Sequence, residues 1–131
     1  MKLHILLIDD DKDELTFFLD ALKNVPTNDG FKCTYASSAR QALEMMQFFV
    51  PDFVFVDYHM PVVTGLQFLS SLRDKPGIEK PKIYLYSIYT NEKITKAALE
   101  MGAAGALRKE YTIRAMSQVL AAVLTFPEMA T

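Results

Sequence analysis

Apolar residues along this chain follow two alternating patterns. Short runs that are apolar throughout, or that alternate apolar and polar positions, predict β-strands. Longer segments between the runs carry an apolar residue every three or four positions, which predicts amphipathic helices. The predicted strands cover residues 3–8, 31–35, 53–56, 82–87 and 105–108.

The segments between the strands also carry helix start and stop signals. Aspartates and a glutamate open the first helix, 11–23, where the helix dipole favours negative charge, and residues 24–30 break it. Ser37 or Ser38 is expected to cap the second helix, which ends before Pro51. Residues 75–77, Lys-Pro-Gly, are expected to stop the third helix.

The last two helices have similar signals. Thr90 or Asn91 is expected to cap the fourth, and Gly102 to end it, while only residues 127–131 follow the fifth. The apolar positions expected to face the core are, helix by helix, Leu15, Phe18, Leu19 and Leu22; Ala42, Leu43, Met46 and Phe49; Leu66, Leu69 and Leu72; Ile94, Ala97, Ala98 and Met101; and Ile113, Met116, Val119, Leu120 and Val123.

Regular alternation of strands and helices predicts an α/β fold, a doubly wound parallel five-stranded sheet made of five βα units. Residues 53–56 are apolar at every position, which is typical of a central strand covered by helices on both faces. No shift in composition marks a linker. We therefore expect a single domain over residues 1–131.

Composition and charge narrow the class of protein. With 131 residues, of which 50% are hydrophobic and 23% charged, the chain has the size of one globular domain. A net charge of -2 and the lack of a basic run argue against nucleic acid as a ligand. Cys33 is the lone cysteine and lies in a predicted strand, so the sequence offers no disulfide framework. No stretch approaches the ~18 consecutive apolar residues of a membrane span, and the apolar run at residues 3–8 is too short for the core of a signal peptide. These features predict a cytoplasmic protein that does not bind a membrane.

Charged side chains follow three of the predicted strands. Asp9 and Asp10 follow the first strand, Asp57 the third and Lys109 the fifth. The carboxyl ends of parallel strands open onto one crevice, the usual ligand position in open α/β sheets. Three carboxylates within ~5 Å repel one another by roughly 3 kcal/mol per pair at an effective dielectric of 20. A hard divalent ion relieves this repulsion, and magnesium, with Asp10 and Asp57 as direct ligands, fits the residues.

The residues that carry these charges also carry a family resemblance. Asp9-Asp10, Asp57, Met60-Pro61 with Thr64-Gly65, Ser87 and Lys109 occur in the order and at the element ends found in response regulator receiver domains. The resemblance covers essentially the whole chain and implies a receiver without an output domain, with the flavodoxin-like strand order 2-1-3-4-5.

The resemblance also implies a mechanism. Asp57 would be the nucleophile that accepts a phosphoryl group, while Lys109 and the Ser87 hydroxyl would bind the phosphoryl oxygens. Asp9 would act on Mg²⁺ through water, and the backbone carbonyl of His59 would complete the metal ligands contributed by the protein. Such a protein is not an enzyme that acts on other molecules, because it catalyses only its own phosphorylation and dephosphorylation.

Partners follow from the same resemblance. A histidine kinase or a histidine phosphotransfer protein would supply the phosphoryl group. Output would pass to a downstream protein through the surface of the fourth helix, fifth strand and fifth helix, by a population shift. Additional apolar residues widen the apolar face of the last helix, which leaves a homodimer possible: Ala115, Ala121, Ala122, Leu124 and Phe126.

Two positions depart from the family pattern. Glu110 follows Lys109 where many relatives have a proline in a cis bond, and Ala106 stands where an aromatic switch residue is usual. Tyr111 is a candidate substitute for that aromatic residue. Tyr89 is expected at the mouth of the site with His59, whereas Tyr84 and Tyr86 are expected to be packing or surface residues.

Three alternative functions remain at this point. A degenerate receiver would act as an interaction module without phosphorylation, which the two departures allow. A haloacid dehalogenase-like, magnesium-dependent phosphatase would want an acid/base aspartate where His59 stands. A flavodoxin-like binding module would want a serine- or threonine-rich phosphate loop after the first strand, where Asp9 to Asp11 would repel a phosphate.

Overall fold

The computed structural model describes residues 2–27, 29–74 and 81–129, with side chains of the last helix described through Leu124. Its five strands form one parallel sheet in the order β2-β1-β3-β4-β5, which confirms the order implied by the resemblance. The strands are β1 (Leu3–Ile8), β2 (Phe31–Ala36), β3 (Phe53–Asp57), β4 (Lys82–Ser87) and β5 (Gly105–Arg108). The helices are α1 (Lys12–Leu22), α2 (Ala39–Met45), α3 (Gly65–Arg73), α4 (Glu92–Glu100) and α5 (Ile113–Met129).

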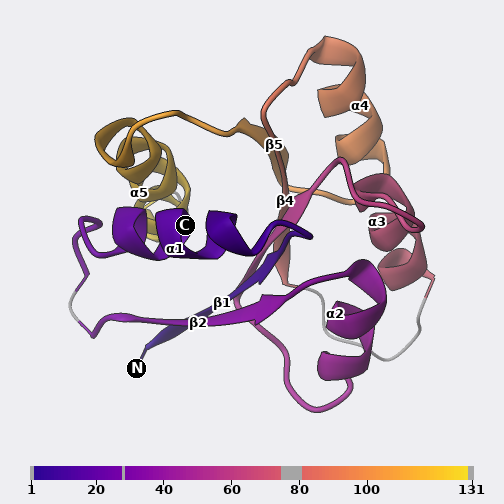
Figure 1. Ribbon diagram of the computed structural model, residues 1–131, viewed down its shortest axis with the longest axis horizontal. Coiled ribbons are helices and arrows are strands. Elements are labelled where there is room, and N and C mark those ends of the chain that lie inside the picture. The colour runs from indigo at the N-terminus through magenta and orange to yellow at the C-terminus, as the bar shows by residue number, and fades with distance from the viewer. Residues whose placement is uncertain (1, 28, 75–80, 130–131) are drawn as a thin grey trace.

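Helices cover both faces of the sheet. In Figure 1, α1 and α5 lie together on one side and α2, α3 and α4 lie on the other. Side chains of successive strand residues point to opposite faces, so β1 divides its buried residues between the two layers. Ile5 and Leu7 pack in the layer with α1 and α5, while Leu6 and Ile8 pack in the other. Among the described residues, no helix combines the length and the apolarity that crossing a bilayer requires.

Each helix from α1 to α4 begins at a polar cap. The side chains of Asp11, Ser38, Thr64 and Asn91 accept hydrogen bonds from backbone N–H groups in the first turn of α1, α2, α3 and α4. These groups would otherwise lack an intrahelical partner. The structure therefore selects Ser38 over Ser37 and Asn91 over Thr90.

Two helix ends differ from what the sequence predicts. The second helix ends at Met45, so Phe49 lies beyond it and stacks on the His4 ring with centroids 4.5 Å apart. Periodicity placed Phe49 in the helix, but in the structure it lies after the helix end and packs against an aromatic ring of β1. The last helix continues to Met129, whereas the sequence predicted that residues 127–131 lie beyond it. Residues 75–77, expected to stop the third helix, lie outside the described residues.

The start of α3 is packed tightly against the end of β3. A Cβ atom at Gly65 would lie 2.7 Å from the Asp57 carbonyl oxygen and 2.8 Å from Leu85 Cδ2. Real Cβ atoms do not approach a backbone oxygen so closely, so a larger residue would push α3 away from the strand end. Glycine at this position therefore fixes the position of Asp57 relative to α3.

We predict that Gly65→Ala destabilises the fold by about 1 to 3 kcal/mol in urea unfolding. Gly105→Ala is the matched control, because a Cβ there would meet Tyr84 at 3.5 Å, an ordinary contact. Equal stability of the two variants would show that the strand end can give way without cost.

Candidate functional site

Strand register brings the candidate residues to one edge of the sheet. Ile8 pairs with Val56, so Asp9 and Asp57, the residues that follow them, lie at the same level. Asp57 pairs with Tyr86, and Ser87 pairs with Arg108, which places Ser87 and Lys109 just beyond that level. The register therefore agrees with the sequence argument in placing these strand-end residues at one edge of the sheet.

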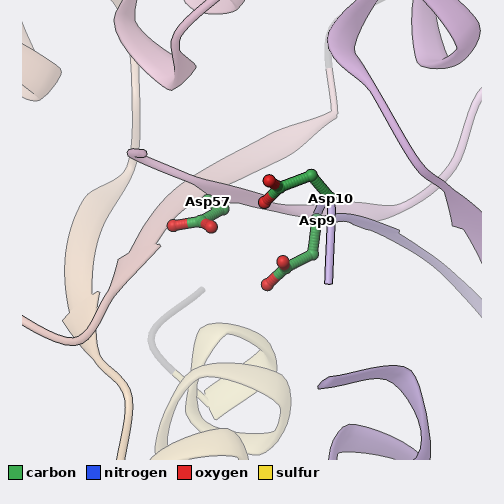
Figure 2. A group of neighbouring side chains, drawn as sticks. All are labelled: Asp9, Asp10 and Asp57. Atoms are coloured by element: carbon green, nitrogen blue, oxygen red, sulfur yellow. The ribbon is translucent and has the colours of Figure 1, made fainter. Parts of the chain in front are cut away.

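Three carboxylates meet at this edge. Asp9, Asp10 and Asp57 each offer an oxygen, and these oxygens all lie within 4.8 Å of one another. In Figure 2 the three side chains extend to the same side of the strand ends, Asp9 and Asp10 from the end of β1 and Asp57 from β3. Asp9 and Asp57 are buried, whereas Asp10 is exposed. Such a cluster of negative charge in a partly dry pocket is unfavourable without a cation.

Lys109 supplies one positive charge to the cluster. Its Nζ donates a hydrogen bond to Asp9 Oδ2 at 2.8 Å and lies 3.6 Å from Asp57 Oδ2. Burial alone would lower the pKa of Lys109, but the hydrogen bond with Asp9 and the charges of Asp57 and Asp9 outweigh burial and raise the pKa. The lysine is therefore positively charged, but its single positive charge does not balance the negative charge of the three carboxylates.

Asp57 shows the cost of this crowding. Burial raises its pKa from 3.8 to about 6, and the charges of Asp9 and Asp10 act in the same direction. Lys109 and the backbone N–H of His59, which donates to Asp57 Oδ1 at 3.2 Å, lower it again. The net effect is that the ionised form of Asp57 is destabilised, although the hydrogen bond from His59 holds its carboxylate in place.

Ser87 and His59 lie beside the carboxylates in different ways. Ser87 is buried at the end of β4, and its Oγ accepts a hydrogen bond from the Tyr89 N–H at 3.3 Å. The backbone carbonyl of Ser87 accepts a bond from the Lys109 N–H at 2.7 Å, which ties β4 to the lysine. The His59 ring is exposed and packs edge-on against Tyr58, so its contact with Asp57 is through the backbone.

Glu14 and Tyr86 also belong to this site, although the sequence did not single them out. Glu14 Oε2 is buried, finds no hydrogen-bond partner among the described residues, and its charge acts on Lys109. The fully buried Tyr86 ring lies 4.9 Å from Lys109 Nζ. A signal for Tyr86 was its position directly before Ser87 at the strand end, whereas nothing in the sequence distinguished Glu14 from the neighbouring Asp13.

The two departures from the family pattern have simple local structures. All described peptide bonds are trans, including the one between Lys109 and Glu110. Ala106 is partly buried against the layer that contains α4, and Tyr111 is exposed. Neither Ala106 nor Tyr111 therefore places an aromatic ring in the layer that contains α4.

The donor set fits a hard divalent cation. It consists of carboxylate oxygens, of which the Asp10 group is exposed and so accessible, and it carries a net negative charge after Lys109 is counted. Magnesium is typically held by one or two carboxylates and retains several waters, which suits a partly exposed cluster of this kind.

Comparison with known proteins gives the family. Residues 5–121 match the family model of the response regulator receiver domain. The probable chemotaxis protein CheY of Rhizobium etli is 28% identical over 123 residues, which cover 93% of this chain and 92% of that protein.

Two solved structures show the same fold. The chemotaxis response regulator CheY4 of Vibrio cholerae has a TM-score of 0.79 at 23% identity, covering 95% of this chain and 100% of that one. The Mn(2+)-bound form of the response regulator Rcp1 has a TM-score of 0.76 at 17% identity, covering 95% of this chain and 93% of that one. The family model, the strand order and the acidic strand-end pocket agree, and the chain belongs to the response regulator receiver domain family of two-component signalling.

Proposed function

We propose that this protein accepts a phosphoryl group on Asp57 from a phosphohistidine of a histidine kinase or a histidine phosphotransfer protein. The observation that carries the proposal is the buried Asp57 carboxylate, clustered with two further carboxylates and facing the Lys109 ammonium at 3.6 Å. No dedicated general base is needed, because Asp57 is ionised at neutral pH with its pKa raised only to about 6.

The transfer exchanges one bond to phosphorus for another. An Asp57 carboxylate oxygen attacks the phosphorus as the P–N bond to the donor imidazole breaks, and the imidazole nitrogen leaves with the bonding electron pair. Lys109 and the Ser87 hydroxyl are proposed to bind the phosphoryl oxygens. Hydrolysis of the aspartyl phosphate later returns the free carboxylate. The protein thus acts on its own side chain and not as an enzyme on other substrates.

Magnesium is the proposed cofactor, held by Asp10 and Asp57 directly, by Asp9 through water and by the backbone carbonyl of His59. When bound, the ion neutralises charge on the carboxylates and on the incoming phosphoryl oxygens. A donor set made only of oxygen atoms, three of them from carboxylates, supports this choice, as does the existence of a relative solved with Mn(2+).

Phosphorylation is proposed to act by shifting a conformational equilibrium that a downstream protein reads from α4, β5 and α5. Tyr89, on the segment between β4 and α4, is 62% exposed, and its backbone N–H is bonded to Ser87. A change at Ser87 would therefore reach the start of α4 through a short segment of backbone.

A homodimer through the last helix is a further proposal, tested by light scattering with and without beryllofluoride.

The phosphoryl-acceptor function is tested with acetyl phosphate or beryllofluoride in the presence of Mg²⁺. We expect one stable adduct per chain, seen by mass spectrometry, which is abolished in Asp57→Asn and retained in Asp13→Asn, an exposed acidic residue of the first turn of α1. Magnesium should also raise the melting temperature of wild type more than that of Asp57→Asn. Absence of any adduct would indicate a receiver used only for interaction, and continuous turnover would indicate a phosphatase.

Asp57→Asn should stabilise the metal-free protein at pH 7.5 by about 2 to 3 kcal/mol. The folded protein binds the Asp57 proton more tightly than the unfolded chain, because burial raises the pKa from 3.8 to about 6. Stability from this carboxyl is therefore complete below its ordinary pKa and is lost as the pH rises through about 6. The gain should disappear near pH 4 in urea unfolding, and a gain of equal size at both pH values would contradict it.

Tyr89→Ala is predicted to speed loss of the phosphoryl group several-fold. Tyr89 lies two residues beyond Ser87, and its hydroxyl accepts a hydrogen bond from Asn91 Nδ2 at 3.3 Å, which restrains the side chain near the start of α4. Bulk there would limit the approach of water to the aspartyl phosphate. Decay of the adduct after removal of acetyl phosphate measures the effect. Tyr89→Phe keeps the bulk and serves as the control, and equal decay in wild type and Tyr89→Ala would count against the prediction.

A further inference from the structure

The Lys109 ammonium has a third neighbour besides the two aspartates. Its Nζ lies 4.9 Å from the centroid of the Tyr86 ring, within the distance at which an aromatic ring attracts a cation. Lys109 is 7% exposed and Tyr86 is fully buried, so water does little to screen this contact. Attraction between a cation and a ring is largest in such a desolvated place.

The carboxylates alone do not fix the position of the ammonium. Asp9 accepts a hydrogen bond at 2.8 Å, whereas Asp57 Oδ2, at 3.6 Å, interacts with the ammonium through charge at longer range. A flexible four-carbon side chain with one short bond retains freedom to turn about that bond. A further contact on another side of the ammonium would remove that freedom.

The Tyr86 ring is itself held from two helices. Phe18 of α1 packs edge-on against it, with centroids 6.0 Å apart and planes at 79°. The Tyr86 hydroxyl contacts Met116 Sδ of α5 at 3.6 Å and interacts with the Glu14 carboxylate. The ring therefore cannot turn away from the lysine without disturbing the core between α1 and α5.

We propose that Tyr86 is a positioning residue for Lys109, with its ring holding the ammonium between Asp9 and Asp57, where it can meet a phosphoryl group. The contact itself stands on the geometry alone, while its effect on phosphorylation rests on the proposed function of Asp57. An aliphatic side chain in place of Tyr86 would leave the buried ammonium over an apolar surface that offers no compensation, and the lysine would shift toward Asp9 or solvent.

Tyr86 is also an ordinary core residue, so the test must separate packing from positioning. Tyr84 provides the matched control: it lies two residues earlier on the same strand and on the same face, and its ring stacks on Phe55 with centroids 5.8 Å apart. Tyr86→Phe keeps the ring and removes the hydroxyl. Tyr86→Leu removes the ring and keeps an apolar side chain.

The first measurement needs no phosphoryl donor. In NMR spectra of the metal-free protein, the Lys109 ε-protons should be shifted upfield by the ring current and show cross-relaxation with the Tyr86 ring protons. We expect Tyr86→Phe and Tyr84→Leu to keep the shift of the Lys109 ε-protons and Tyr86→Leu to lose it. Lack of the shift and of the cross-relaxation in wild type would overturn the proposal even if Tyr86→Leu fails to fold.

The second measurement uses acetyl phosphate and Mg²⁺. Tyr86→Leu should lower the maximal phosphorylation rate about tenfold, with little change in the half-saturating acetyl phosphate concentration, while Tyr86→Phe stays near wild type. Equal losses in Tyr86→Leu and Tyr84→Leu would mean general loosening of the core and would refute positioning, as would an unchanged rate in Tyr86→Leu. If wild type is not modified at all, the proposed function fails, and the NMR comparison still decides the positioning role.

Discussion

Crowding of negative charge at the ends of β1 and β3 is the constraint on which this site depends. Asp9, Asp10 and Asp57 place oxygens within 4.8 Å of one another, and the pKa of Asp57 is raised to about 6. A structure optimised for stability alone would not bring these groups together, because each pair repels and two of the three are buried. Lys109 offsets part of this repulsion, and the remainder favours whatever brings further positive charge to the pocket.

The fold maintains this arrangement through backbone geometry. Parallel pairing of Ile8 with Val56 fixes Asp9 and Asp57 at one level, and the close contact at Gly65 fixes α3 against the Asp57 carbonyl. Hydrogen bonds from the Asp11 N–H to Asp9 Oδ1 at 2.9 Å and from the His59 N–H to Asp57 Oδ1 orient the two buried carboxylates. Neither aspartate can relieve the repulsion by turning away without losing a backbone hydrogen bond, which costs more in a buried place than at the surface.

Much of this could be predicted from the sequence, because strand ends are marked by a change from apolar to charged residues. Asp9, Asp57 and Lys109 were found in this way, and parallel pairing requires such ends to meet. The neighbours of Lys109 could not be found by the same reasoning. Alternation shows that Tyr84 and Tyr86 share a face but does not say which helices cover it, and nothing in the first turn of α1 distinguishes Glu14, which turns inward, from the exposed Asp13. Phe49 was misplaced for a related reason, since stacking on His4 depends on a contact distant in the sequence.

The position of Tyr86 also offers a route by which a change at the site could reach α5. Ala106 packs in the layer with α2, α3 and α4 and is too small to move as a ring would, whereas Tyr86 packs in the layer with α1 and α5. A series of buried contacts runs from Asp57 to Lys109, from Lys109 to the Tyr86 ring, and from the Tyr86 hydroxyl to Met116 of α5. Close-packed interiors transmit small displacements, so any shift of the lysine on phosphorylation would press on α5 from inside the core. In this chain the helix that contributes to the proposed output surface is therefore in contact with the site through its buried face, independently of the backbone that joins Ser87 to α4.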